Sequence, residues 1–139
     1  MGGGPPRRPA AVSLLLDTHA FLWWVSGSPR LPASVIAAID AEPDVLVSAV
    51  TGYEITLKHA LGRLPGAAVL ARDVAGTVAL SGFRALAIGL RHAEAAGRLP
   101  LAHRDPFDRI LAAQALVEEM ALVSADAALD ALGVVRLWD

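Results

Sequence analysis

Short apolar runs of strand length alternate along this chain with longer segments that have helical spacing. The apolar runs lie at residues 12–16, 45–47, 83–87, 121–123 and 134–137. Most of them show no polar alternation, which is typical of strands buried on both faces of a parallel sheet. The pattern therefore predicts five short strands, of which 83–87 is the weakest.

Helical spacing fills most of the chain between these runs. The segments that show it are 18–25, 33–41, 50–61, 67–80, 90–96, 105–120 and 125–132. The clearest is 105–120, where Asp105 is a good N-cap and Pro106 takes the favoured first helical position. Strands that alternate with helices predict a three-layer α/β/α sandwich with a mainly parallel central sheet.

Length and composition fit one domain of this class. The chain has 139 residues, enough for a substantial core. Residues 1–11, rich in Gly, Pro and Arg, are expected to be a flexible leader, and 12–139 a single domain. Although 55% of the residues are hydrophobic, no apolar run approaches the roughly 18 residues that a membrane-spanning helix needs. We therefore expect a cytoplasmic protein that does not enter a membrane.

Several acidic residues stand where predicted strands and helices meet. Asp17 and Asp126 each follow a predicted strand, Glu54 lies inside a helical segment, and Asp108 lies one turn after Asp105. Parallel sheets bind ligands beyond the carboxyl ends of their strands. Asp17 and Asp126 are therefore expected to project into one crevice, onto which Glu54 and Asp108 can also open.

Carboxylates gathered in this way favour a divalent-cation site. Mg²⁺ and Mn²⁺ prefer hard oxygen ligands and are usually held by one or two carboxylates together with substrate phosphates. Without a cation, two carboxylates about 5 Å apart repel each other by about 3 kcal/mol at an effective dielectric constant of about 20. The cluster thus implies a metal or raised pKa values, and a bound cation can polarise a phosphodiester and activate a water molecule.

Most of these acids also have an interpretation as helix caps. Asp17 directly precedes a helical segment that it can cap, and Asp126 can cap the helix near Ala127. Asp105 is better explained as a cap than as a ligand, because Pro106 directly follows it. Asp108 stands where an acidic side chain can complete a capping box, although Glu and Gln suit that position better.

Glu54 has two interpretations of its own. With Thr51 as the N-cap, Glu54 completes a capping box. Ser48 is an equally good N-cap, and a helix that begins there leaves Glu54 beyond the first turn, free to face a ligand.

Three basic residues near these acids are candidates for phosphate contacts. His103 and Arg104 directly precede Asp105, and Lys58 lies four residues after Glu54. Lys58 can equally form a helix-surface ion pair with Glu54.

Charge and cysteine content limit the chemistry further. The formal net charge of −2, from 12 basic and 14 acidic residues, permits a nucleic-acid partner without indicating one. A cation that neutralises the four acids Asp17, Glu54, Asp108 and Asp126 leaves 10 acidic residues against the 12 basic ones. The chain has no cysteine, which excludes disulfides, thiolate metal sites and a cysteine nucleophile.

Four stretches carry these acids in a characteristic order. They are LLLDTHAFLWW at 14–24, SAVTGYEITLK at 48–58, HRDPFDRILAAQA at 103–115 and LVSAD at 122–126. In their order and separations they resemble the PIN-domain nucleases, and most closely the VapC-type toxins of bacterial toxin–antitoxin pairs. The resemblance covers about residues 12–139.

The resemblance assigns a role to each acid. Asp17, Glu54, Asp108 and Asp126 match the first to fourth acids of the family, which are its catalytic and metal-binding residues. Asp105 belongs to the motif as a cap or supporting residue.

Smaller features of the motifs agree with this assignment. Thr18 and Ser124 are candidate supporting hydroxyls beside the acids. Two departures leave every acid in place: Tyr53 stands where many relatives have Trp, and Ser124-Ala125-Asp126 replaces the more usual Thr-x-Asp.

The resemblance also implies a function. It implies hydrolysis of RNA phosphodiester bonds with one or two Mg²⁺ or Mn²⁺ ions, a homodimer, and inhibition by a cognate antitoxin protein. Two alternatives within the family are an RNA-processing nuclease that is not a toxin and a catalytically silent binding module. Outside it, aspartyl-phosphate phosphatases also place an Asp after the first strand, but their Asp-x-Asp-x-Thr motif is broken here by His19.

Overall fold

A computed structural model describes residues 13–139. The predicted leader, 1–11, lies outside the described residues, as does the first residue of the predicted 12–16 strand. The strands are β1 (Leu14–Leu16), β2 (Val45–Ser48), β3 (Arg84–Leu86), β4 (Ala121–Val123) and β5 (Arg136–Leu137). The helices are α1 (Thr18–Ser26), α2 (Ala33–Ala41), α3 (Ala49–Ala60), α4 (Ala68–Arg72), α5 (Val74–Leu80), α6 (Leu90–Arg98), α7 (Pro106–Val117) and the 3₁₀ helix η1 (Ala127–Leu132).

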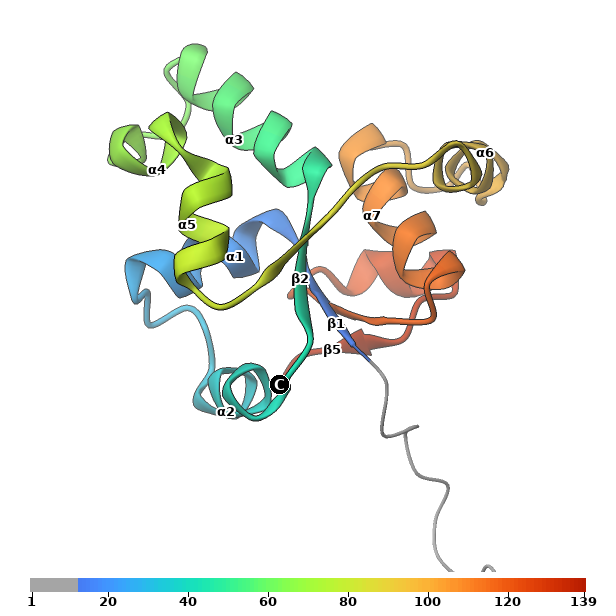
Figure 1. Ribbon diagram of the computed structural model, residues 1–139. Helices are drawn as coiled ribbons and strands as arrows, with labels where there is room; N and C mark the ends of the chain where they lie inside the picture. The colour runs from blue at the N-terminus through green and yellow to red at the C-terminus, as the bar shows by residue number, and fades with distance from the viewer. Residues whose placement is uncertain (1–12) are drawn as a thin grey trace, which may run out of the picture.

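All five described strands pair in parallel, in the order β3-β2-β1-β4-β5 (Figure 1). In the central register, Leu15 of β1 lies between Leu46 of β2 and Leu122 of β4. The predicted sandwich with a parallel central sheet is confirmed.

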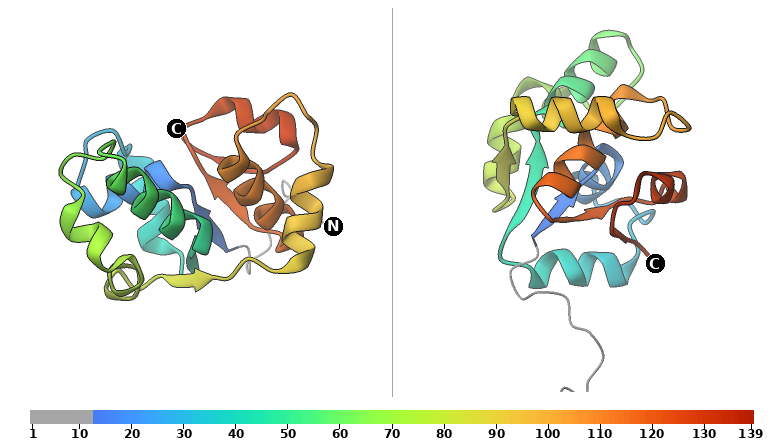
Figure 2. Two further views of the ribbon diagram at one scale, coloured as in Figure 1. Left: turned by 90° about the horizontal axis from the view of Figure 1, so that it is seen from above. Right: turned by 90° about the vertical axis from the view of Figure 1, so that its right-hand side faces the viewer.

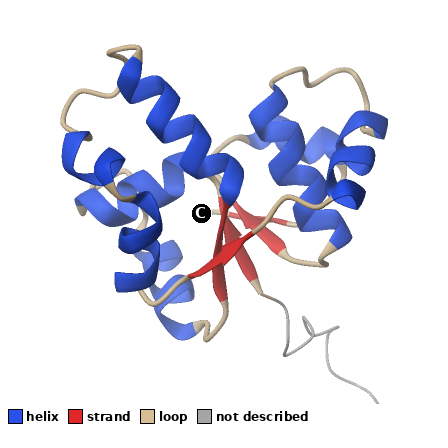
Figure 3. Cartoon of the chain, turned by 45° about the horizontal axis from the view of Figure 1, so that its top comes forward, coloured by secondary structure: helices blue, strands red, loops and turns tan. Residues whose placement is uncertain are grey.

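Alternate residues of the short strands supply two separate cores. Leu15, Leu46 and Leu122 face α7 and η1, whereas their neighbours in the same strands face α1, α2, α4 and α5. Figure 2 shows these two groups of helices on opposite sides of the sheet, and Figure 3 shows them diverging from it. Because the strands are buried on both faces, the absence of polar alternation in their sequences has a direct structural cause.

Helix α3 lies at the seam between the two cores. Val50, in its first turn, packs into the α7 side, and Ile55 packs into the α1 side. Its cap settles the alternative that the sequence leaves open, because the Ser48 hydroxyl accepts a hydrogen bond from the Val50 amide at 3.0 Å. Glu54 therefore lies beyond the first turn of the helix.

One predicted helix, 67–80, is wrong as a single element. The chain breaks at Asp73, whose backbone adopts φ −156° and ψ 76°, so that α4 ends and α5 begins there. The Asp73 carboxylate accepts a hydrogen bond from the Gly76 amide at 2.8 Å. Aspartate is more favourable as a helix cap than inside a helix. The capping bond of Asp73 therefore divides the segment into two helices, although its apolar spacing is continuous.

The predicted helix 105–120 ends earlier, at Val117. Glu119 takes a left-handed conformation with φ 56°, and the Met120 amide bonds back to the Ala115 carbonyl at 2.8 Å. The predicted helix 125–132 forms as the shorter 3₁₀ helix η1.

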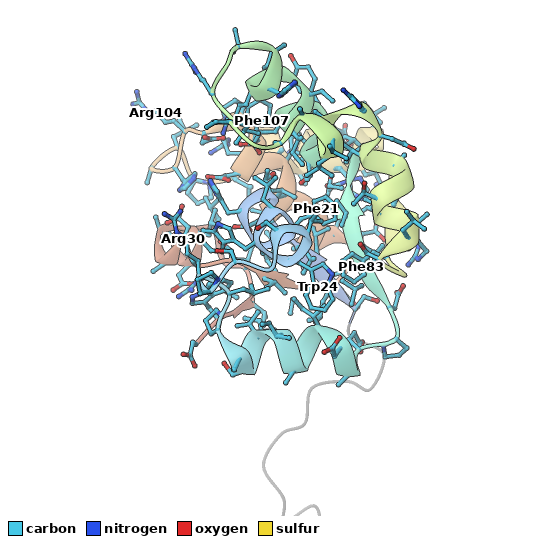
Figure 4. All side chains as sticks on the ribbon, turned by 90° about the vertical axis from the view of Figure 1, so that its left-hand side faces the viewer. Phe21, Trp24, Arg30, Phe83, Arg104 and Phe107 are labelled. Atoms are coloured by element: carbon cyan, nitrogen blue, oxygen red, sulfur yellow. The ribbon has the colours of Figure 1, made fainter. Side chains whose placement is uncertain are left out.

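Aromatic side chains fill the α1 side of the sheet. Trp24 and Phe21 of α1 both contact Phe83, with ring centroids 5.5 and 6.5 Å apart (Figure 4). None of the helices in the described part of the chain combines the length and apolar character needed to span a membrane.

Candidate metal centre

The strand order creates a switch point between β1 and β4. From β1 the chain runs to β2 and β3 on one side of the sheet, and later to β4 and β5 on the other. Ligands of open parallel sheets bind at such a point, beyond the carboxyl ends of the strands. Asp17 directly follows β1, and Ser124 and Asp126 follow β4, so the topology brings these residues to the same edge.

Asp17 is held in place by both neighbouring elements. Its amide donates to the Val123 carbonyl at 3.0 Å, and its Oδ1 accepts from the Ala20 amide at 2.8 Å as the N-cap of α1. The side chain is buried and also hydrogen-bonded to Ser124. Burial raises the pKa of the Asp17 carboxyl, the hydrogen bonds from Ser124 and Ala20 oppose that rise, and the negative charge of Asp108 adds to it.

Asp108 projects from the first turn of α7. Asp105 is the cap of this helix, because its Oδ1 accepts from the amides of Phe107 and Asp108 at 2.9 and 3.1 Å. Asp108 itself does not cap the helix, and its Oδ2 lies 2.9 Å from His103 Nε2. Burial raises the pKa of the Asp108 carboxyl, His103 lowers it, and the charges of Asp105 and Asp126 raise it further.

Asp126 completes a compact group of ligand atoms. One atom each from His103, Asp108 and Asp126 lies within 4.8 Å of the others. Asp126 also caps η1, since its Oδ1 accepts from the Ala128 amide at 3.0 Å, and its own amide donates to the Ser124 hydroxyl at 3.1 Å.

Glu54 belongs to a neighbouring, separately bonded set. Its Oε1 accepts from the Thr18 hydroxyl at 2.7 Å, and that hydroxyl lies 3.0 Å from the Thr51 hydroxyl. Its Oε2 forms an ion pair with Lys58, so the helix-surface pair expected as one alternative is present. Within residues 13–139, Glu54 and Asp17 are not part of the group within 4.8 Å. Glu54 reaches Asp17 through the adjacent Thr18.

The remaining predicted residues are placed as follows. Thr18 and Ser124 both hydrogen-bond site acids, as the sequence suggests. Arg104 is exposed on the loop before α7, at the outer edge of the molecule (Figure 4). The side chain of His103 is only 12% exposed and faces Asp108, which leaves it little surface for a phosphate contact.

Sequence reasoning missed Arg109. Its guanidinium donates to the carbonyls of Ala96, Leu99, Pro100 and His103 at 2.6 to 2.9 Å. These bonds tie the end of α6 and the following loop to α7. Backbone acceptors leave no pattern of residue types in a sequence. The only sequence signal for Arg109 is therefore its position directly after Asp108.

The donor set fits a hard divalent cation. Asp17, Asp108 and Asp126 supply carboxylate oxygens, the ligands that Mg²⁺ and Mn²⁺ prefer. The pKa values of Asp17 and Asp108 are both raised, mainly by burial and further by neighbouring acids, so ionisation costs more at these carboxyls than at free ones. A bound cation removes that cost.

Fold and site together define a three-layer α/β/α domain with an acid-lined switch point. The PIN-domain family model matches residues 14–135 of this sequence. The chain belongs to the PIN-domain family, whose members are typically nucleases that use divalent metals. Among curated proteins, no relative matches the sequence.

Solved structures of similar fold come from several bacterial systems. FitAcB from Neisseria gonorrhoeae is 21% identical, with a TM-score of 0.68, over 90% of this chain and 96% of that one. A toxin–antitoxin complex from Klebsiella pneumoniae is 21% identical, with a TM-score of 0.65 and the same coverage. VapBC2 from Rickettsia felis, bound to a DNA fragment from its promoter, is 12% identical, with a TM-score of 0.68, over 92% and 100%. At these identities the likeness establishes the fold.

Proposed function

We propose that this protein is a metal-dependent ribonuclease that acts as the toxin of a toxin–antitoxin pair. The observation that carries the proposal is the convergence of Asp17, Asp108 and Asp126 at the switch point of a PIN domain. The pattern of four acids in family order supports the same assignment.

Asp17, Glu54, Asp108 and Asp126 would hold one or two Mg²⁺ or Mn²⁺ ions. When bound, such an ion polarises the scissile phosphodiester and lowers the pKa of a water molecule. Thr18 orients Glu54, Ser124 orients Asp17, and Asp105 fixes the start of the helix that carries Asp108. The chain's own contribution is thus a set of acids held in place before substrate arrives.

Arg104 and Lys58 are the residues that we propose as RNA contacts. Arg104 is exposed beside the site, and Lys58, 32% exposed, already neutralises one oxygen of Glu54. Both would meet phosphates, which position RNA without reading its sequence. The third candidate, His103, faces Asp108 instead.

An apolar hollow beside α1 is the surface that we propose for an antitoxin partner. An apolar hollow of 440 Å³ lies between the end of α1 and helices α4 and α5, lined by Leu22, Val25, Leu64 and Val69 among others. Val69, at the edge of this hollow, is 79% exposed. Several structures of similar fold are titled as toxin–antitoxin complexes. We propose that a cognate antitoxin covers this surface, that the toxin forms a homodimer, and that both act in the cytoplasm.

RNA cleavage by the purified protein tests the enzymatic half of the proposal. A mixed structured RNA is incubated with the wild-type protein or with Asp17→Asn, in Mn²⁺ or in EDTA. Asp40→Asn, at an exposed position of α2, serves as the matched control. We expect cleavage by the wild type and Asp40→Asn in Mn²⁺ only, and at least a hundredfold loss for Asp17→Asn, because a metal-binding oxygen is lost. Cleavage that persists in Asp17→Asn or EDTA would contradict the metal mechanism.

Growth arrest separates the toxin from the two alternatives. Induced wild-type protein should arrest a bacterial host, and Asp108→Asn should not. An active nuclease that leaves growth unchanged would indicate an RNA-processing enzyme. Arrest by both variants would indicate a binding role that does not need catalysis.

A further inference from the structure

His103 lies against the acids of the candidate metal centre. Its Nε2 is 2.9 Å from Asp108 Oδ2, and a carboxylate oxygen of Asp126 is within 4.8 Å of both. Two ligand atoms that occupy neighbouring octahedral corners at about 2.1 Å from an ion are about 3 Å apart. His103 Nε2 and Asp108 Oδ2 therefore have the spacing of two ligands of one ion.

The backbone that carries His103 is fixed from α7. Arg109 Nη1 donates to the His103 carbonyl at 2.8 Å and to the Pro100 carbonyl at 2.6 Å, while its Nη2 donates to Leu99 and Ala96. The rigid guanidinium fork holds four acceptors at once, which a lysine cannot do. Helix α7 therefore carries Asp108 directly, and its next residue, Arg109, holds the backbone of His103.

Exposure separates His103 from its basic neighbour. Arg104 is exposed, whereas the His103 side chain is 12% exposed and its Nε2 faces the acids. A residue that only met RNA phosphates would present its ring nitrogen outward. The orientation of His103 instead favours a partner inside the centre.

We propose that His103 is a nitrogen ligand of this metal centre, and that the centre therefore binds Mn²⁺ in preference to Mg²⁺. Carboxylates suit both ions, and imidazole is most typical of later transition metals such as Fe²⁺ and Zn²⁺. Mn²⁺, as a first-row transition ion, still accepts a nitrogen ligand more readily than Mg²⁺, which keeps a shell of oxygen ligands and water. The inference rests on the proposed function, because it concerns the same centre. It adds a nitrogen to a set of four acids.

A simpler role for His103 makes a different prediction. If the ring only hydrogen-bonds Asp108 and orients it, its loss weakens the site for every ion alike. If it is a ligand, its loss weakens Mn²⁺ binding selectively and removes a nitrogen from the coordination shell.

Metal binding and pulsed EPR distinguish these roles without any activity assay. Calorimetry measures Mn²⁺ and Mg²⁺ affinity for the wild type, His103→Ala, His103→Gln and the exposed control His59→Ala, and unfolding in EDTA confirms that each variant folds. We expect both His103 variants to bind Mn²⁺ at least about tenfold more weakly and Mg²⁺ less than about threefold more weakly. Nitrogen coupling to bound Mn²⁺ should be present in the wild type and His59→Ala and absent from both His103 variants.

Two outcomes would overturn the inference, and they differ in what else they affect. In the first, the His103 variants lose affinity for Mn²⁺ and Mg²⁺ equally, and nitrogen coupling is either the same in the wild type and the variants or absent from all of them. That result would leave the metal centre in place and reduce His103 to a positioning role. Failure of the wild type to bind either ion would remove the proposed metal-dependent function itself, and the inference with it.

Discussion

Single carboxylates in this domain serve both a helix and the site. Asp17, Asp105 and Asp126 each accept a backbone amide through Oδ1 at the start of a helix, which leaves Oδ2 free of these capping bonds. Cap and ligand, which the sequence presents as alternatives, are therefore compatible in one side chain. Asp108 is the exception, because Asp105 caps its helix, and both oxygens of Asp108 remain free of backbone bonds among the described residues.

Asp17→Asn should stabilise the metal-free protein while it removes metal binding. Asparagine caps a helix as well as aspartate does, and it removes a buried charge that lies near Asp108. We expect the free energy of unfolding in EDTA to rise by about 1 kcal/mol, the usual scale of a single stabilising substitution. Added Mn²⁺ should raise the melting temperature of the wild type and leave that of Asp17→Asn unchanged. A variant that is less stable in EDTA would show that the Asp17 charge is already compensated.

Arg109 links two helices and the loop between them through backbone acceptors alone. Arg109→Ala leaves four carbonyls of residues 96–103 without this donor. We expect a loss of about 2–4 kcal/mol in the free energy of unfolding. Arg109→Lys, which keeps the charge but not the fork, should recover less than half of it.

Urea denaturation measures the Arg109 effect, and amide hydrogen exchange locates it. Exchange should accelerate in the loop 99–104 and at the end of α6, and remain slow in β1 and β4. Uniform acceleration across the domain would mean that Arg109 supports the whole fold and not this connection.

Strands β1, β2 and β3 are joined at their amino ends by Asp44. Its carboxylate accepts from Ser13 and from the Arg84 guanidinium, with both Arg84 nitrogens 3.1 Å from its oxygens. Arg84, followed by Ser13, holds the pKa of the Asp44 carboxyl below its usual value. The ionised form is thus the one that stabilises the fold. That contribution is present above the unfolded pKa of about 3.9 and is lost as pH falls through the lower folded value.

Asp44→Asn should therefore have an effect that depends on pH. At pH 7 we expect a loss of less than about 1 kcal/mol, because the pair is partly exposed and screened by solvent. The difference from the wild type should shrink below about pH 3, where both chains lack the charge, and also in about 1 M salt. Urea titrations of both proteins at pH 7 and below about pH 3 measure this difference in the free energy of unfolding. A difference that stays constant would assign the effect to packing.

Strands and caps are the features that this sequence predicts best. The runs at 45–47 and 121–123 are strands because their residues are buried on both faces, and Asp105 caps its helix as the local pattern predicts. Ser48 is the cap among the two alternatives that the sequence leaves open. The break at Asp73 was missed because an apolar periodicity continues across it. The sequence identified His103 only as a candidate for phosphate contacts and did not identify Arg109, because the contact of His103 with Asp108 and the carbonyl acceptors of Arg109 depend on the folded path of residues 99–104.

At the scale of the whole domain, the proposed function requires a slightly negative protein to bind a polyanion beside a cluster of acids. The net charge is −2, and the acids at the switch point repel phosphate until a cation neutralises them. Topology predicts where these acids meet, since Asp17 and Asp126 follow neighbouring strands. Under the proposed function we therefore expect the affinity for RNA to depend on the metal.

Asp108→Asn should therefore strengthen RNA binding in the absence of metal. Removing one carboxylate charge near the expected phosphate path should raise the affinity for a short single-stranded RNA in EDTA by about three- to tenfold. Asp40→Asn changes the net charge equally but on exposed α2, and should leave the affinity within about twofold because solvent and salt screen distant charges. Fluorescence anisotropy at two salt concentrations measures both. If the two variants behave alike, total charge governs binding and the RNA does not approach the switch point. If only Asp108→Asn binds more tightly, the acids that would hold the metal are also the barrier that keeps RNA out until the metal is bound.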